Sequence, residues 1–99
     1  MAYDPGALET ALAAAVGDDP ALIVELRRAF LESARLHLDS LRAAATTNEW
    51  QESAYRLKGL AASFGATALM DAADAAAEEV AGTQAALRLA ERALARFGR

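Results

Sequence analysis

Four residues near the middle of the chain combine a reactive ring with groups suited to binding. Tyr55 carries a phenol, and Lys58 carries a cation about one helical turn later. Gly59 and Ala62 have almost no side chain, so they would leave room for another surface to approach closely. A large ring beside a cation and two small residues is typical of a docking surface rather than of a core.

The apolar pattern of the same stretch predicts which way Tyr55 points. A helix that turns by about 100° per residue places the large apolar side chains on one side and Tyr55 almost opposite to them. We therefore expect Tyr55 to face outward while the apolar side joins a core. That apolar side consists of Trp50, Leu57, Ala61 and Phe64, with Leu60 at its margin.

His37 is the only histidine in the chain, and its imidazole is a second ring that could act as a nucleophile. Helical spacing puts it at nearly the angle of Phe30 and between Leu26 and Leu41, so we expect it to point toward the core, hydrogen-bonded within the core or at its edge. A reactive imidazole would need solvent and a partner molecule within reach. The neighbours of His37 offer no set of metal ligands, and we expect no metal site and no cofactor.

Charged residues form two further patterns near the C-terminus, one acidic and one basic. Their helical spacing predicts facing, solvated stripes joined by weak salt bridges, rather than a metal or anion site. There is also no glycine-rich phosphate loop and no paired carboxylates set in a cleft. The acidic stripe is Asp71, Asp74 and Glu78, and the basic stripe is Arg88, Arg92 and Arg96.

Capping signals divide the chain into five predicted helices. Asp4-Pro5 and Asp19-Pro20 each offer an N-cap followed by proline at the first helical position. Asn48 with Gln51 resembles a capping box, and glycines follow the expected helix ends. The predicted helices are Ala7–Val16, Ala21 to about Ala45, Glu49–Phe64, a fourth capped by Thr67 and reaching Ala81, and a fifth capped by Thr83 and reaching Phe97.

The predicted helices and their short connections favour one all-α fold. No segment alternates apolar and polar residues over the length of a strand, and links of two to five residues favour antiparallel neighbours in an up-and-down bundle. The inward stripe of the second helix is expected to include Leu22, Phe30 and Leu41. In the fourth helix it is expected to include Leu69, Ala73, Ala76 and Val80.

Length and composition limit the classes of function. The 99 residues, 55% of them hydrophobic, are expected to form a single domain over residues 1–99. A net charge of −4 argues against nucleic acid as a partner. The chain has no cysteine, no basic segment followed by an apolar run at its N-terminus, and no apolar stretch of the roughly 20 residues that a membrane helix needs. We expect a soluble, cytoplasmic monomer that does not bind membranes.

The stretch around Tyr55 resembles the signature of histidine-containing phosphotransfer (Hpt) domains. The signature is Ala-His-x-Leu-Lys-Gly, a stretch of small residues and then Gly-Ala. The corresponding run here is Ala54-Tyr55-Arg56-Leu57-Lys58-Gly59, followed by Ala61-Ala62-Ser63-Phe64-Gly65-Ala66. The resemblance extends to the Asp-Pro opening, the Gly-Asp-Asp-Pro turn, Phe30-Leu31-Glu32 and a tryptophan ahead of the motif. It implies a four-helix bundle with a short N-terminal helix packed across one end.

The resemblance also implies a role in a two-component phosphorelay, with two departures. The interval from Trp50 to the acceptor position is about one helical turn shorter than the family pattern, and the acceptor itself differs. In the family, a receiver's phosphoaspartate passes its phosphoryl group to a histidine, and this position holds Tyr55 here. An imidazole titrates near 6.5 and has a free lone pair at neutral pH, whereas a phenol titrates near 10 and would form a stable phosphate ester. The resemblance implies that Lys58 attracts the phosphoryl group or an acidic receiver pocket, and that Gly59 clears space for it.

Three hypotheses follow from these residues. The leading one is a pseudo-Hpt module that binds response-regulator receiver domains as a competitor or adaptor without transferring phosphate, with a histidine kinase as a second candidate partner. Its docking residues would be Arg56, Lys58, Gly59, Ala62 and Ser63 around Tyr55. The alternative is a structural or oligomerisation bundle with no phosphorelay role. A relay through His37 is the least favoured.

Overall fold

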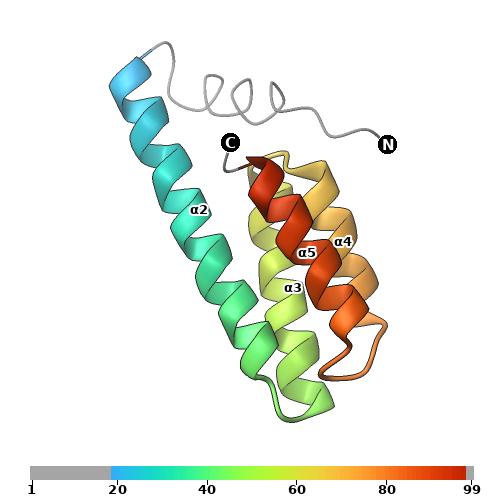
Figure 1. Cartoon of the computed structure of the whole chain (residues 1–99). Helices are drawn as coiled ribbons and strands as arrows, with labels where there is room; N and C mark the ends of the chain where they lie inside the picture. Colours follow the sequence, from blue (N-terminus) through green and yellow to red (C-terminus); the bar gives the residue numbers. More distant parts are fainter. Residues whose placement is uncertain (1–18, 98–99) are drawn as a thin grey trace.

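Four helices form the part of the protein that the structure, a computed structural model, describes, which is residues 19–97. They are α2 (Pro20–Ala43), α3 (Thr47–Ser63), α4 (Thr67–Ala77) and α5 (Gln84–Phe97). Each helix packs against the next, and α5 also packs against α2, so the four close into an up-and-down antiparallel bundle (Figure 1). The prediction of an all-α four-helix bundle is confirmed. The predicted short helix over 7–16 lies outside the described residues.

α2 begins where its capping signal predicts. The Asp19 carboxylate accepts hydrogen bonds from two backbone N–H groups of the first turn, at 3.1 and 3.2 Å, and Pro20 opens the helix. The helix ends at Ala43, two residues before the predicted end. The prediction that Leu22 lies in the core is wrong, since its side chain is 44% exposed. Leu22 lies in the first turns of α2. Because α2 has 24 residues and α3 only 17, these turns extend beyond the end of α3 and have no part of it beside them.

α3 begins earlier than predicted and has a different cap. The N-cap is Thr46 rather than Asn48, because the Thr46 hydroxyl accepts a hydrogen bond from the Glu49 backbone N–H at 3.1 Å. The same hydroxyl donates to the Glu49 carboxylate at 3.0 Å. Thr-x-x-Glu is a closer match to a capping box than Asn-x-x-Gln, and Asn48 lies within the first turn of the helix.

Replacing the true cap is therefore expected to destabilise the bundle. Thr46→Ala removes the acceptor of the Glu49 N–H and should lower the free energy of unfolding by about 1 kcal/mol. Asn48→Ala should change it by less than about 0.5 kcal/mol, since Asn48 caps nothing. Urea denaturation followed by circular dichroism measures both values. A larger loss for Asn48→Ala would show that α3 begins at the position predicted from sequence.

Gly65 ends α3 as predicted. It adopts a φ of 67°, in the left-handed region that glycine enters without steric cost. The N–H of Ala66 donates to the Ala61 carbonyl at 2.9 Å and that of Gly65 donates to the Ala62 carbonyl at 3.2 Å, which is a Schellman motif. The following cap differs from the prediction, because Thr67 is already the first residue of α4 and Ala66 is its N-cap, with no side-chain bond.

α4 ends at Ala77, four residues before the predicted end. The indole of Trp50 donates to the Ala76 carbonyl at 2.7 Å, and the side-chain amide of Gln51 donates to the Ala77 carbonyl at 3.4 Å. These bonds from α3 satisfy carbonyls that a longer α4 would use itself. Val80 consequently falls in the loop after the helix and is 69% exposed, so its predicted place in the core is wrong. The connection to α5 spans residues 78–83, longer than expected.

The core is one continuous cluster to which all four helices contribute. Its largest fully buried side chains include Trp50, Phe30 and Phe97. The ring of Phe30 lies 4.9 Å from that of Phe64 and 6.2 Å from that of Phe97, between ring centroids, so aromatic contacts join α2 to the ends of α3 and α5. Phe64 is only half-buried. Phe30, Trp50 and Phe97 are in the core, and Phe64 packs against it.

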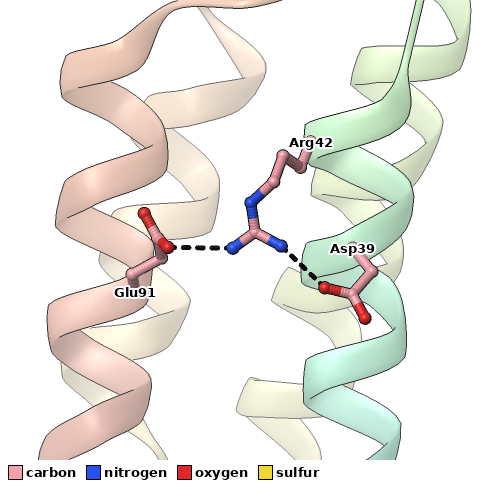
Figure 2. A network of polar contacts seen from close by, with 3 residues as sticks. All are labelled: Asp39, Arg42 and Glu91. Carbon is pink, nitrogen blue, oxygen red and sulfur yellow. Dashed lines mark hydrogen bonds and ion pairs between the residues drawn. The ribbon is translucent and has the colours of Figure 1, made fainter.

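An exposed ion-pair network joins α2 to α5 on the surface. Arg42 binds Asp39 on its own helix at 2.7 Å and Glu91 of α5 at 2.8 Å (Figure 2). The hydrogen bond to Glu91, and then that to Asp39, raise the pKa of Arg42 above its ordinary value. All three side chains are substantially exposed to solvent, so packing of the core rather than this network holds the two helices together.

Length and apolar character together decide whether a helix can cross a bilayer. Within residues 19–97, no helix combines the two to the extent that a membrane span needs.

Candidate functional site

Tyr55 lies on the outer face of α3, as its helical angle predicts. Its side chain is 54% exposed, whereas Trp50, Leu57 and Ala61 on the other side of the same helix are fully buried. A half-exposed ring of this size is well placed to bury surface against a partner.

Gly59 and Ala62 continue the exposed stripe that Tyr55 begins. Both are exposed, and they follow Tyr55 by four and seven residues, which puts all three on one side of the helix. A Cβ atom built on Gly59 would meet no atom within 4 Å. Gly59 also has no positive φ. Neither packing nor backbone conformation therefore requires a glycine at this position.

Arg56 borders the stripe on the side of α2. It forms an ion pair with Glu52, one turn earlier on α3, and lines a surface groove with Ser40 and Ala43 of α2. The Arg56 and Glu52 side chains are both more than half exposed. Oppositely charged residues four apart on a helix are spaced to interact, so this pair can be predicted from the sequence.

Ser63 lies on the outer face as well, but its hydroxyl is engaged. It donates a hydrogen bond to the Gly59 carbonyl one turn earlier, at 2.9 Å. That local bond satisfies the hydroxyl proton within the helix and leaves the oxygen as an acceptor toward solvent.

Lys58 borders the stripe on the side of α4, where it meets Asp74. The ammonium and the carboxylate are 2.8 Å apart, with side-chain exposures of 41% and 59%. The hydrogen bond to Asp74, and then the attraction of its charge, raise the pKa of Lys58 above its ordinary value of 10.5, with a smaller contribution from Tyr55. A raised pKa means that the pair contributes to stability at neutral pH and loses this contribution as the pH rises through the folded-state value.

The pairing of Asp74 differs from the predicted salt bridges between acidic and basic stripes. Asp74 binds Lys58 of α3 instead of an arginine of α5. Asp71 is the acidic residue that lines a groove with Arg92 and Arg96, on the side of α4 that faces α5. The sequence gives no sign of the link between Lys58 and Asp74, because 16 residues and a turn separate them and no local pattern joins them.

His37 is partly buried on α2, in agreement with a position at the edge of the core. The part of the chain that the structure describes contains no group of three or more histidine, cysteine, aspartate or glutamate residues that could hold a metal ion.

A protein-family model matches most of the chain. The model described as "Hpt domain" covers residues 25–98, which include most of α2, all of α3, α4 and α5, and the whole outer stripe of α3. Neither the curated proteins nor the solved structures contain a significant match.

Proposed function

The chain belongs to the Hpt domain family, and we propose that it works in a two-component phosphorelay as a pseudo-Hpt module that binds receivers without accepting phosphate. Residues 1–99 form a single domain in this proposal and act as a cytoplasmic monomer without a cofactor. The partner is the receiver domain of a response regulator, and a histidine kinase is a second candidate.

The observation that carries the proposal is Gly59 beside the exposed ring of Tyr55. Glycine inside a helix costs about 1 kcal/mol relative to alanine. Since Gly59 packs against nothing and has no positive φ, the fold gains nothing from this cost. Free space beside an accessible ring is what close docking of a second protein requires.

Four further residues around Tyr55 and Gly59 support receiver docking. Arg56 and Lys58 lie on either side of the stripe, each in an exposed ion pair that a partner can replace, and Ala62 adds a small exposed residue. The acceptor oxygen of Ser63 lies next to them. What the face lacks is an imidazole, and a phenol in its place is a poor nucleophile at neutral pH. The chemistry therefore favours recognition of the receiver over transfer of its phosphate.

The direct test is to titrate the protein with receiver domains of the organism that encodes it, phosphorylated and unphosphorylated, by isothermal titration calorimetry. The proposal expects binding of at least one receiver and loss of that binding in Tyr55→Ala. If wild type binds no receiver, or if Tyr55→Ala keeps every partner, the alternative of a structural or oligomerisation bundle is favoured, and size-exclusion chromatography would then test self-association.

Filling the space at Gly59 should move stability and binding in opposite directions. Gly59→Gln is expected to raise the free energy of unfolding by about 0.5–1 kcal/mol, because a better helix former enters an open position. The same side chain should weaken receiver binding by about tenfold or more, since it occupies the docking space.

A matched control is Ala95→Gln, which adds a similar side chain to an exposed position of α5, a helix that does not contact α3. It should leave receiver binding unchanged. Denaturation and calorimetry give both quantities for each variant. Undiminished binding by Gly59→Gln would remove the main support for the docking face.

A further inference from the structure

The cation expected to meet the receiver is already occupied by the protein's own carboxylate. Lys58 Nζ lies 2.8 Å from Asp74 Oδ1, within hydrogen-bond distance. The two residues come from neighbouring helices, α3 and α4, so the pair spans the border of the outer stripe of α3. Lys58 lies three residues after Tyr55, and its ammonium is close enough for the phenol to affect its pKa.

We propose that Asp74 competes with the receiver for Lys58 and thereby limits the affinity and the choice of receiver. The inference rests on the proposed function, and Asp74 is a specificity-determining residue that acts through Lys58 rather than by contact with the phosphate. An acidic receiver pocket must draw the ammonium away from Asp74 and must also approach the Asp74 carboxylate. Receivers with the strongest negative potential overcome this competition best.

The charge balance around Tyr55 supports the proposal. Arg56 is paired with Glu52 on one side of the stripe, and Lys58 is paired with Asp74 on the other. Two cations and two carboxylates leave no net charge on these four residues, so the face does not present the positive patch that Arg56 and Lys58 alone would form. Glu52 belongs to α3, as Arg56 does, whereas Asp74 belongs to α4 and Lys58 to α3.

The exposure of the pair makes the competition reversible. Both side chains are reached by water, and exposed ion pairs of this kind are weak and screened by salt. A receiver can therefore replace Asp74 as the partner of Lys58 without disturbing the core. A buried pair would instead hold the lysine permanently.

The test compares Asp74→Asn with Asp71→Asn. Both substitutions remove one negative charge from exposed positions of α4, but Asp71 lines the groove shared with Arg92 and Arg96, whereas Asp74 is the carboxylate that binds Lys58. Receiver binding by Asp74→Asn should be about two- to fivefold tighter than that of wild type, with a smaller gain at high salt. Binding by Asp71→Asn should change by much less.

Two additional measurements separate competition from a structural effect. In a double-mutant cycle, Lys58→Met should abolish the gain caused by Asp74→Asn, because the gain requires a free ammonium. An NMR titration of the Lys58 Cε should give a lower pKa in Asp74→Asn than in wild type and the wild-type pKa in Asp71→Asn.

Each outcome bears on a different statement. Tighter binding by Asp74→Asn than by wild type, in a gain that needs Lys58, supports the inference. Binding by wild type that Asp74→Asn leaves unchanged, or that both asparagine variants increase equally, overturns the inference and leaves the proposed function standing. Failure of wild type and Asp74→Asn alike to bind any receiver overturns both.

Discussion

Tyr55→His is expected to turn the protein into an acceptor of phosphate from a phosphorylated receiver. Wild type should show no detectable transfer, whereas the variant should acquire phosphate that is labile in acid and stable in base. The effect on activity is large, because this single substitution changes the result from none to a measurable phosphoprotein.

The physical reason lies in the nucleophile and in its accessibility. Tyr55 is 54% exposed, so a side chain at this position can meet the phosphoaspartate of a docked receiver. A neutral imidazole nitrogen attacks the phosphorus, the bond from phosphorus to the aspartate oxygen breaks, and the aspartate leaves as a carboxylate. Half or more of the imidazoles are neutral at pH 7, whereas nearly all phenols keep their proton. Lys58 can attract the transferred group once its ammonium has left Asp74.

The experiment follows radioactive phosphate from a receiver to the protein and then tests its stability to acid. Tyr55→Phe, which has no acceptor, is the matched control and should remain unlabelled. His37→Gln combined with Tyr55→His should still be labelled, since His37 is partly buried on α2. Phosphate on wild type that His37→Gln removes would contradict the proposal and favour a relay through His37.

Trp50→Ala is expected to cause the largest loss of stability. The Trp50 side chain is fully buried, and its indole donates to the Ala76 carbonyl at 2.7 Å. Truncation removes a large apolar side chain and leaves a cavity between α3 and α4, which typically costs about 3–5 kcal/mol. Since domains of this size are stable by only about 5–15 kcal/mol, the variant should lose a large part of its free energy of unfolding.

Trp50→Phe separates the cavity from the hydrogen bond. The Ala76 carbonyl also accepts from the Glu79 N–H at 3.0 Å, so loss of the indole donor does not leave it unpaired. The phenylalanine variant should therefore lose only about 1–2 kcal/mol. Leu36→Ala, at a position 66% exposed, should change stability by less than about 0.5 kcal/mol. Urea denaturation followed by circular dichroism at the helix minimum measures the series. Equal losses for both Trp50 variants would contradict a dominant cavity cost.

Several features of the fold and the site were predictable because their causes are local. Asp19 and Pro20 start α2 through bonds within one turn, and Gly65 ends α3 through its own positive φ. The outward position of Tyr55 follows from its angle on a regular helix relative to Trp50 and Leu57. The motif around it indicated the family, which the match over residues 25–98 establishes.

The caps of α3 and α4 were predicted wrongly because more than one nearby residue could begin each helix. Thr46 and Asn48 are both good caps, and the choice between them depends on which one reaches Glu49. Thr67 has the residue type of a cap, but the tight turn at Gly65 already brings the chain into α4 one residue earlier.

The sequence by itself determined the helical class, the starts of α2 and α5, and the residues that form the outer stripe of α3. Only the tertiary structure decided where α4 ends, because donors from Trp50 and Gln51 on α3 satisfy its last carbonyls. Only the tertiary structure gave Lys58 its partner, because Asp74 is distant in sequence and adjacent only after α3 and α4 pack. Helical periodicity specifies a direction around one axis, whereas these contacts depend on the relative positions of two axes.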